Sequence, residues 1–264
     1  MDLGLDNSIV LITGSTKGLG FATAQVLIEE GAKVMINSRH QNNIDIAIKR
    51  LSNKKTNHNL SGFACDVTNA ESCRMIVEKT TEYFGGLDIL ITNSGGPPPG
   101  SFDELSTKQW KDAIDLSFLS HLNLIKNSLP FLLQSQSPSV LAVTSFTIKN
   151  PLNNLILSNT VRAATAALIK SLSLDLGKQG IRFNSILPGW TKTERVEKLL
   201  AKKSQANKTS IEYEIDQISR TIPLGRMGSP QEFAKVAAFL VSPIASYING
   251  VMLNVDGGIT KGLF

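Results

Sequence analysis

Cysteine, histidine and long apolar segments are scarce in this chain of 264 residues. Its two cysteines, Cys65 and Cys73, have no framework spacing, so we expect reduced thiols buried for structural reasons. The three histidines have no metal-ligand spacing, so no metal site is predicted. No apolar run approaches the roughly 20 residues that a membrane span needs.

The first residues, MDLGLDNS, lack a basic region and an apolar core, so we expect no signal peptide and a cytoplasmic location. The formal charge of +5 and pI of about 9.2 suit an anionic ligand such as a phosphorylated cofactor. The densest basic stretches, residues 54–55 and 198–208, are short and are interpreted as solvated surface. A nucleic-acid face would need interleaved aromatics, so neither nucleic acid nor a membrane is an expected partner.

Short apolar runs alternate with helical patterns along the whole chain. Expected strands cover residues 9–12, 33–38, 62–65, 87–92, 140–144, 182–187 and 251–255. Expected helices cover residues 21–32, 42–51, 70–84, 107–134, 154–178 and 230–241, with a polar loop at 52–61. Residues 191–220 are polar and are expected to be helical or mobile. The alternation predicts one α/β domain over residues 1–264, a Rossmann-type doubly wound parallel sheet with helices on both faces.

Residues 10–20, VLITGSTKGLG, join the first strand to the first helix through a glycine-rich turn. Gly14 permits the tight turn, Gly18 lets a pyrophosphate approach the backbone, and Gly20 lets the helix pack closely on the strand. The N–H groups at the helix start then face the phosphates. We therefore predict a dinucleotide cradle, with a plain strand-to-helix turn as the alternative; its residues are Gly14, Ser15, Thr16, Lys17, Gly18, Leu19 and Gly20.

Further motifs follow the carboxyl ends of the other strands, where open α/β sheets bind ligands. They are Arg39, the pair Asp66 and Val67, the run Asn93-Ser94-Gly95-Gly96, Ser145, and the run PGWTKT from Pro188 to Thr193. With the glycine turn and the segment IPLGRMGSPQEFAKVAAFLVSPIASYINGVMLNVDGG, they make the chain similar to the short-chain dehydrogenase/reductase family over almost its whole length. Within that family, it resembles the 3-oxoacyl-acyl-carrier-protein reductases.

The expected cofactor is NADP(H). NAD sites usually carry an acid after the second strand, whereas Ser38 and Arg39 stand here. Arg39 could pair with a 2′-phosphate, and Lys17 adds a second positive charge. The alternative is that both are solvated surface charges.

The resemblance also assigns roles along the cofactor. It implies that Asp66 binds the adenine amino group and that Val67 adds a backbone contact, although Asp66 or Thr68 could instead cap the next helix. It places Asn93 between strands near the cofactor, Gly95 beside the nicotinamide ribose, and Thr193 near the carboxamide or the phosphates. Ser94, Pro188 and Gly189 belong to the same motifs.

The catalytic positions that the resemblance predicts depart from the family pattern. Ser145 matches the family serine, which polarises the carbonyl. Ser158 stands at the tyrosine position, Arg162 at the lysine position and Ser117 at the asparagine position. Serine is a far weaker acid than tyrosine, and arginine stays charged, but Arg162 could hold the ribose and stabilise a developing alkoxide. Tyr213, Lys149 and His121 are weaker candidates to replace the tyrosine.

Two functions stay open. One is an NADP(H)-dependent carbonyl or alcohol oxidoreductase with an atypical site. It is favoured by the kept Ser145 and Thr193 and by an expected substrate lid at residues 191–220. The other is a catalytically silent NADP(H)-binding protein with a regulatory or structural role. The apolar helices at residues 107–134 and 154–178 resemble those through which relatives form homodimers or homotetramers, with a monomer as the alternative.

Overall fold

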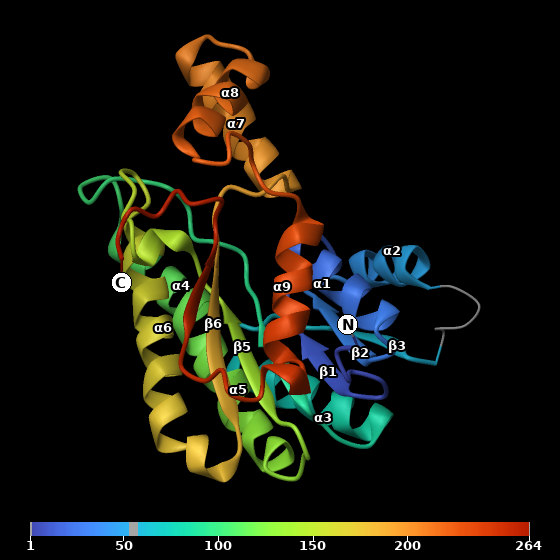
Figure 1. Cartoon of the computed structure of the whole chain (residues 1–264). Helices are drawn as coiled ribbons and strands as arrows, with labels where there is room; N and C mark the ends of the chain where they lie inside the picture. The colour runs from blue at the N-terminus through green and yellow to red at the C-terminus, as the bar shows by residue number, and fades with distance from the viewer. Residues whose placement is uncertain (1, 53–57, 264) are drawn as a thin grey trace.

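A seven-stranded, wholly parallel sheet forms the centre of the protein in the computed structural model, which describes residues 2–52 and 58–263 (Figure 1). The strand order is β3-β2-β1-β4-β5-β6-β7, so the order reverses between β1 and β4. The strands are β1 (Ile9–Ile12), β2 (Lys33–Ser38), β3 (Leu60–Ala64), β4 (Ile89–Thr92), β5 (Ser139–Val143), β6 (Arg182–Pro188) and β7 (Met252–Val255). The predicted Rossmann-type fold is confirmed.

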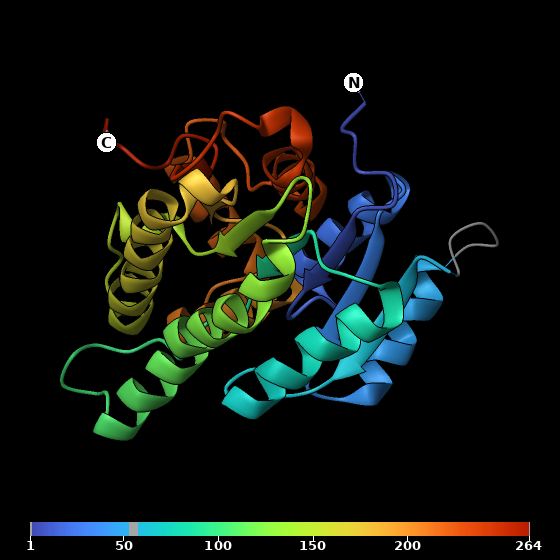
Figure 2. The same ribbon diagram turned by 90° about the horizontal axis from the view of Figure 1, so that it is seen from below.

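Helices cover both faces of the sheet (Figure 2). One face carries α1 (Gly18–Glu29), α2 (Gln41–Leu51) and α9 (Pro230–Val241). The other carries α3 (Ala70–Phe84), α4 (Thr107–Ile114), α5 (Ser120–Leu132) and α6 (Ile156–Asp175). Two further helices, α7 (Glu194–Asn207) and α8 (Ile211–Thr221), project beyond the carboxyl ends of the strands, at the top of Figure 1.

Two apolar cores result because successive strand residues point to opposite faces. Val10 and Ile12 of β1 pack in the core beneath α1 and α9, whereas Leu11 packs in the core beneath α3 and α5. Strand β4 repeats the alternation, with Ile89 and Ile91 on the first face and Leu90 on the second. The sheet is therefore buried on both faces, as parallel sheets are.

The helix expected over residues 107–134 is interrupted. Ser106 and Gln109 cap α4 reciprocally, and the helix then widens into a π-helical turn at Asp115–Leu119 before α5 begins. Ser117 lies in this π turn, and its backbone carbonyl accepts a hydrogen bond from the Thr165 hydroxyl of α6. Such turns are frequent at functional sites.

Several expected boundaries were wrong. Helix α1 begins at Gly18 instead of residue 21, so the glycine turn supplies its first residues. Strand β3 begins at Leu60, inside the expected polar loop of residues 52–61, and residues 53–57 of that loop, with the basic pair 54–55, lie outside the described residues. Helix α6 covers Ile156–Asp175, a shorter span than residues 154–178.

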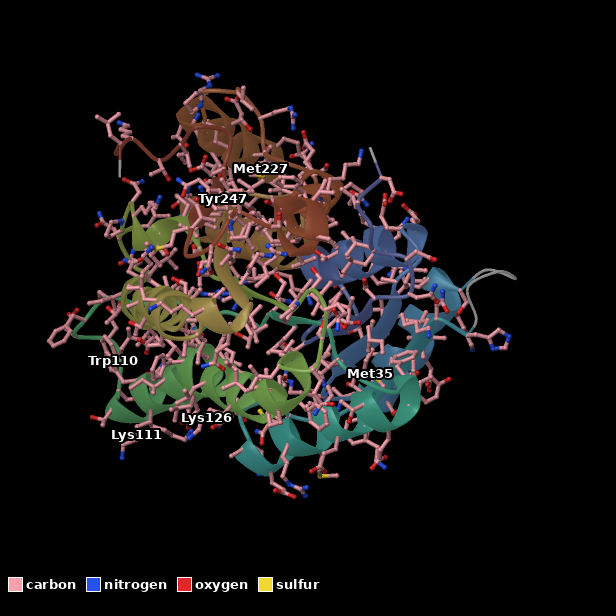
Figure 3. All side chains as sticks on the ribbon, turned by 60° about the horizontal axis from the view of Figure 1, so that its bottom comes forward. Met35, Trp110, Lys111, Lys126, Met227 and Tyr247 are labelled. Carbon is pink, nitrogen blue, oxygen red and sulfur yellow. The ribbon has the colours of Figure 1, made fainter. Side chains whose placement is uncertain are left out.

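Side chains fill the layers between sheet and helices, with Met35 buried and Lys111 and Lys126 exposed on α4 and α5 (Figure 3). Cys73 is buried and Cys65 is half-buried, and burial raises the pKa values of their thiols to about 12 and about 11. In the described part of the chain, no helix is long and apolar enough to cross a membrane. The same residues contain no cluster of histidine, cysteine or acids that could hold a metal ion.

Candidate dinucleotide site and active site

The glycine turn lies at the carboxyl end of β1, beside the point where the strand order reverses. Gly14 and Gly18 have φ values of +56° and +59°, which favour glycine. A Cβ on Gly20 would lie 2.6 Å from the Gly14 carbonyl oxygen, so only glycine lets α1 approach the turn this closely. The first N–H groups of α1 have no side-chain cap, since Lys17 at the N-cap position makes no capping hydrogen bond. This cradle fits a pyrophosphate.

Buried polar groups support the turn from below. The Ser15 hydroxyl donates to the Ile12 carbonyl at 2.7 Å and accepts from the Asn37 N–H at 2.9 Å. The Ser15 N–H donates to the Asn37 carbonyl, so the hydrogen-bonding groups of this predicted cofactor residue face the protein. Ser15 thus shapes the cradle, while Thr16, half-buried beside it, is closer to the surface.

Asn37 supports the glycine turn, a contribution that the sequence did not predict. It is 3 % exposed at the end of β2, and its side-chain Oδ1 accepts from the Gly14 N–H at 3.2 Å. Its amide nitrogen donates to the carbonyls of Phe63 and Cys65 at 3.1 and 3.2 Å. The signal was a polar residue inside the apolar strand KVMINS, because a buried amide needs partners.

Asn93, at the end of β4, binds the opposite side of the turn. Its side-chain nitrogen donates to the Gly14 carbonyl at 3.0 Å, and its backbone N–H donates to the Thr13 hydroxyl at 2.9 Å. The next residues, Ser94 and Gly95, follow β4 toward the open end of the sheet, with Gly95 exposed.

The residues expected around the adenosine lie along the ends of β2 and β3. Arg39 and Asp66 are exposed, and the Ser38 hydroxyl accepts from the Asn43 amide at 3.3 Å. Asp66 accepts from the Thr68 N–H at 3.0 Å, while Asn69 caps α3. Both alternatives for the N-cap, Asp66 and Thr68, were therefore wrong.

Buried Val67 and half-buried Leu19 are apolar members of the predicted cofactor set. Val67 packs in the core beneath α3, and Leu19 packs against the core on the α1 face. Their side chains therefore help to hold the β3 end and the glycine turn in place.

The segment after β6 passes close to the glycine turn. Pro188 ends β6, and a Cβ on Gly189 would lie 2.6 Å from the Asp256 Cα, so glycine is needed there. Thr193 caps α7 through the Val196 N–H, and its methyl group would lie 3.7 Å from a Cβ on Gly18. Lys17 also pairs with Glu194, the first residue of α7, at 4.0 Å, with both side chains more than half exposed.

Arg162, one of the predicted catalytic residues, is buried. Its Nη1 donates to the carbonyls of Val143 and Thr144 at 3.1 and 2.8 Å, and its Nη2 donates to the Gly95 carbonyl at 3.3 Å. These bonds place the guanidinium at the end of β5, directly before Ser145. Burial, and secondarily the charge of Arg195, lower the pKa of Arg162 to about 10, so it is a cation at neutral pH.

The three predicted catalytic serines differ in burial and in their hydrogen bonds. Ser145 accepts from the Thr147 N–H at 3.2 Å, which leaves its own proton available. Ser158 is half-buried four residues before Arg162, on the same face of α6. Ser117 is 1 % exposed, and its hydroxyl has no hydrogen-bond partner within the described residues. Its carbonyl is joined to α6 through Thr165, one turn after Arg162.

The three alternative acids lie in unfavourable places. His121 is 1 % exposed, its Nδ1 lies 2.7 Å from the Thr92 hydroxyl, and burial, then Arg162, lowers its pKa to about 3. The ring is neutral at physiological pH. Lys149 donates to the Met252 carbonyl of β7 at 3.1 Å, and Tyr213 is about half exposed on α8.

Helices α7 and α8 are tied together by a buried acid. Glu214, 2 % exposed in its side chain, pairs with Lys203 at 2.8 Å and accepts from Thr209 and Asn207 at 2.7 and 2.9 Å. These partners lower the pKa of Glu214 to about 2. Because one carboxylate joins both helices, they form a single unit over the open end of the sheet.

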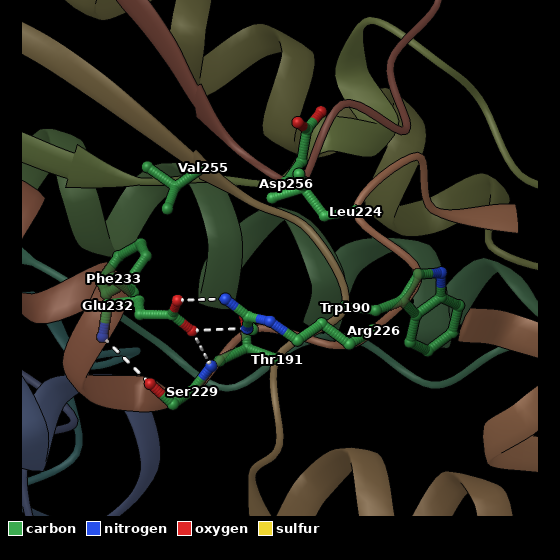
Figure 4. Close-up of a pocket in the computed structure, with 11 residues that line it drawn as sticks. Trp190, Thr191, Leu224, Arg226, Ser229, Glu232, Phe233, Val255 and Asp256 are labelled. Carbon is green, nitrogen blue, oxygen red and sulfur yellow. Dashed lines mark hydrogen bonds and ion pairs between the residues drawn. The ribbon is translucent and has the colours of Figure 1, made fainter. Parts of the chain in front are cut away.

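A pocket is lined by the segments that precede α7 and follow α8 and by the start of α9 (Figure 4). Arg226 and Glu232 cross it as a bidentate pair at 2.9 and 2.6 Å, and Glu232 also accepts from the Ser229 N–H at the start of α9. The charges of Arg226 and Glu232 are thus paired with each other inside the pocket.

A reversal of strand order beside a glycine cradle defines a dinucleotide-binding protein of the Rossmann type. Residues 14–260 match the family model described as enoyl-(acyl carrier protein) reductase. The chain is 32% identical to the dehydrogenase/reductase SDR family member 4 of Bos taurus, over 96% of this chain and 88% of the relative. It is 28% identical to the 3-oxoacyl-acyl-carrier-protein reductase of Vibrio cholerae, over 97% of this chain and 99% of the relative.

Two solved structures are also similar over almost the entire chain. The L-sorbose reductase of Gluconobacter frateurii, complexed with NADPH and L-sorbose, has a TM-score of 0.95 at 28% identity, covering 100% of both chains. An NADPH-bound short-chain oxidoreductase of Pseudomonas aeruginosa with an atypical catalytic center has a TM-score of 0.88 at 27% identity, covering 97% and 99%. The chain belongs to the short-chain dehydrogenase/reductase family of oxidoreductases.

Proposed function

We propose that this chain is an NADP(H)-dependent oxidoreductase that interconverts a carbonyl and an alcohol through an atypical site of Ser117, Ser145, Ser158 and Arg162. The buried Arg162 guanidinium beside Ser145 is the observation on which the proposal rests. The similarity to acyl-carrier-protein reductases favours a 3-oxoacyl-like substrate. The two similar NADPH complexes favour the cofactor.

The cradle around Gly14, Gly18 and Gly20 fits the pyrophosphate, because added Cβ atoms would fill it. Lys17 and Arg39, both exposed, would attract the additional 2′-phosphate of NADP(H). When bound, the nicotinamide supplies or accepts the hydride. The chain's own residues therefore have to orient the substrate and stabilise its charge.

Ser145 would donate its available proton as a hydrogen bond to the substrate oxygen. Arg162 would offer a fixed positive charge to the same oxygen as it becomes an alkoxide. With no tyrosine at Ser158, the alkoxide would take its proton from water. Lacking a positioned general acid costs about 100- to 10,000-fold in rate, so we expect a slow enzyme.

Helices α7 and α8 are proposed as the substrate lid. The glutamate network joins them, and Thr193 and Glu194 contact the glycine turn at their base. A homodimer or homotetramer is also proposed, since Ile114, Leu133 and Leu174 expose 39%, 50% and 70% of their surfaces near α4, α5 and α6. Light scattering of the purified protein tests the oligomeric state.

A catalytically silent NADP(H)-binding protein is the second candidate. It is favoured by the neutral state of buried His121, which carries no extra proton to donate at physiological pH. NADPH oxidation over a panel of 3-oxoacyl thioesters, ketoses and quinones separates the two functions. Slow turnover of any of them supports the enzyme, whereas tight NADPH binding without turnover supports the silent protein.

A further inference from the structure

Two arginines from different elements meet at the loop after β4. Arg162 of α6 donates to the Gly95 carbonyl at 3.3 Å, and Arg195 of α7 donates from Nη1 to the Gly96 carbonyl at 3.0 Å. The Arg195 Nη2 lies 3.4 Å from the Pro97 carbonyl. Because consecutive Cα atoms are about 3.8 Å apart, both cations lie within roughly 10 Å of each other.

Gly96 is shaped for this contact. A Cβ on Gly96 would lie 2.1 Å from the Arg195 Nη2, so the guanidinium rests directly on the glycine backbone. Arg195 therefore extends from the proposed lid down to the loop that leads into the catalytic positions.

Neither arginine has an acidic partner in the described part of the chain, where both donate only to neutral carbonyls. The nearest acid along α7, Glu194, pairs with Lys17 on the opposite side. Burial, and then the charge of Arg195, lower the pKa of Arg162, whereas burial alone lowers the pKa of Arg195. Two neighbouring cations without a counter-charge form a site that an anion would complete.

We propose that Arg195 is a specificity-determining residue that binds a carboxylate of the substrate, so that the preferred substrates are oxo acids. The inference rests on the proposed oxidoreductase function and narrows its 3-oxoacyl-like substrate to an oxo acid with a free carboxylate, in place of an acyl thioester. The planar guanidinium can bind a carboxylate through two parallel hydrogen bonds. The carbonyls that it now contacts are neutral and do not balance its positive charge. The contacts with Gly96 and Pro97 join the proposed lid to this loop.

The test compares 2-, 3- and 4-oxo acids with their methyl esters, for the wild type and for Arg195→Gln and Arg195→Lys. We expect the wild type to prefer an acid, and Arg195→Gln to raise the KM for that acid about 10- to 100-fold while the KM for its ester changes less than 3-fold. Arg195→Lys should recover part of the loss. Lys198→Gln, an exposed residue of the same helix, removes the same charge and should leave both KM values unchanged.

Equal changes of the KM values for acid and ester would overturn the proposal, since Arg195 would then only hold the lid in place. A weaker NADPH affinity of Arg195→Gln with an unchanged KM for the acid would also overturn it, by assigning the cation to cofactor phosphate. Calorimetric binding of the same acids to the NADP⁺-loaded protein separates this inference from the enzyme function. Binding of an acid that Arg195→Gln weakens, without turnover of any compound, would support the anion site and contradict the oxidoreductase.

Discussion

Arg162 and Arg182 provide a matched pair of buried cations, of which only the first is placed to act on a substrate. Arg182, 7 % exposed, donates to the carbonyls of Leu240, Val241 and Ser242 at 2.7, 2.9 and 3.0 Å, where it caps the end of α9. Arg162, 8 % exposed, likewise donates to three backbone carbonyls. Substituting each arginine by methionine therefore removes the same number of charge-assisted bonds.

The loss of stability should be similar in the two variants. Each hydrogen bond from a charged group contributes about 1.5–3 kcal/mol, and removing the ion relieves a desolvation penalty of several kcal/mol. We expect the free energy of unfolding to fall by about 2–4 kcal/mol for both Arg162→Met and Arg182→Met. Urea unfolding measures this fall.

The effect on turnover should differ between them. Removing a donor that stabilises an oxyanion costs about 100- to 1,000-fold in kcat. We expect this loss in Arg162→Met on the best carbonyl substrate at saturating NADPH, with the kcat of Arg182→Met within about 3-fold of the wild type. Equal kcat values for the two variants would refute the assignment of Arg162 to the reacting oxygen.

Three further outcomes follow from single contacts. His121→Gln should make the free energy of unfolding less dependent on pH below 6.5. The pKa of His121 is about 3 in the folded state, below its ordinary 6.5. The wild type therefore loses up to about 1.4 kcal/mol of its free energy of unfolding per pH unit as the pH falls below 6.5. Parallel unfolding curves for wild type and variant would contradict this. Gly20→Ala should weaken NADPH binding at least 10-fold, because its Cβ would meet the Gly14 carbonyl at 2.6 Å, whereas Gly86→Ala, with its nearest contact at 3.6 Å, should bind normally in a fluorescence titration. Arg39→Asp should lower the preference for NADPH over NADH at least 10-fold, measured as the ratio of dissociation constants, and an unchanged ratio would make Arg39 a surface charge.

The sheet and the glycine cradle could be predicted because their causes are local. A strand buried on both faces is a short apolar run, as in IVLI of β1, and the runs are separated by helical patterns. Gly14 and Gly18, which have positive φ values, are the residue type that such a turn favours. The class of fold could therefore be predicted from the sequence.

The contacts between distant segments could not be predicted in this way. Asn37 supports Gly14 across 23 residues, and Arg195 reaches Gly96 across 99. The sequence around Asn37 and Arg195 does not indicate their hydrogen-bond partners, because only the sheet order and the placement of α7 bring the partners together. The N-cap Asn69 was missed for a local reason, since it competes with two other good capping residues within four positions.

The π turn at Ser117 shows that the side chains of the site can change while its backbone hydrogen bonds are kept. The turn leaves the Ser117 carbonyl to the Thr165 hydroxyl, and this bond needs no particular side chain at position 117. Likewise, the carbonyls of Val143, Thr144 and Gly95 would accept from lysine as well as from Arg162, although lysine could not span all three at once. A frame built from carbonyls therefore tolerates substitution of the side chains that it positions. This tolerance explains how a chain can keep the family fold with serine and arginine at its proposed catalytic positions, and it makes the kinetics of Arg162→Lys more informative than those of any change to the frame.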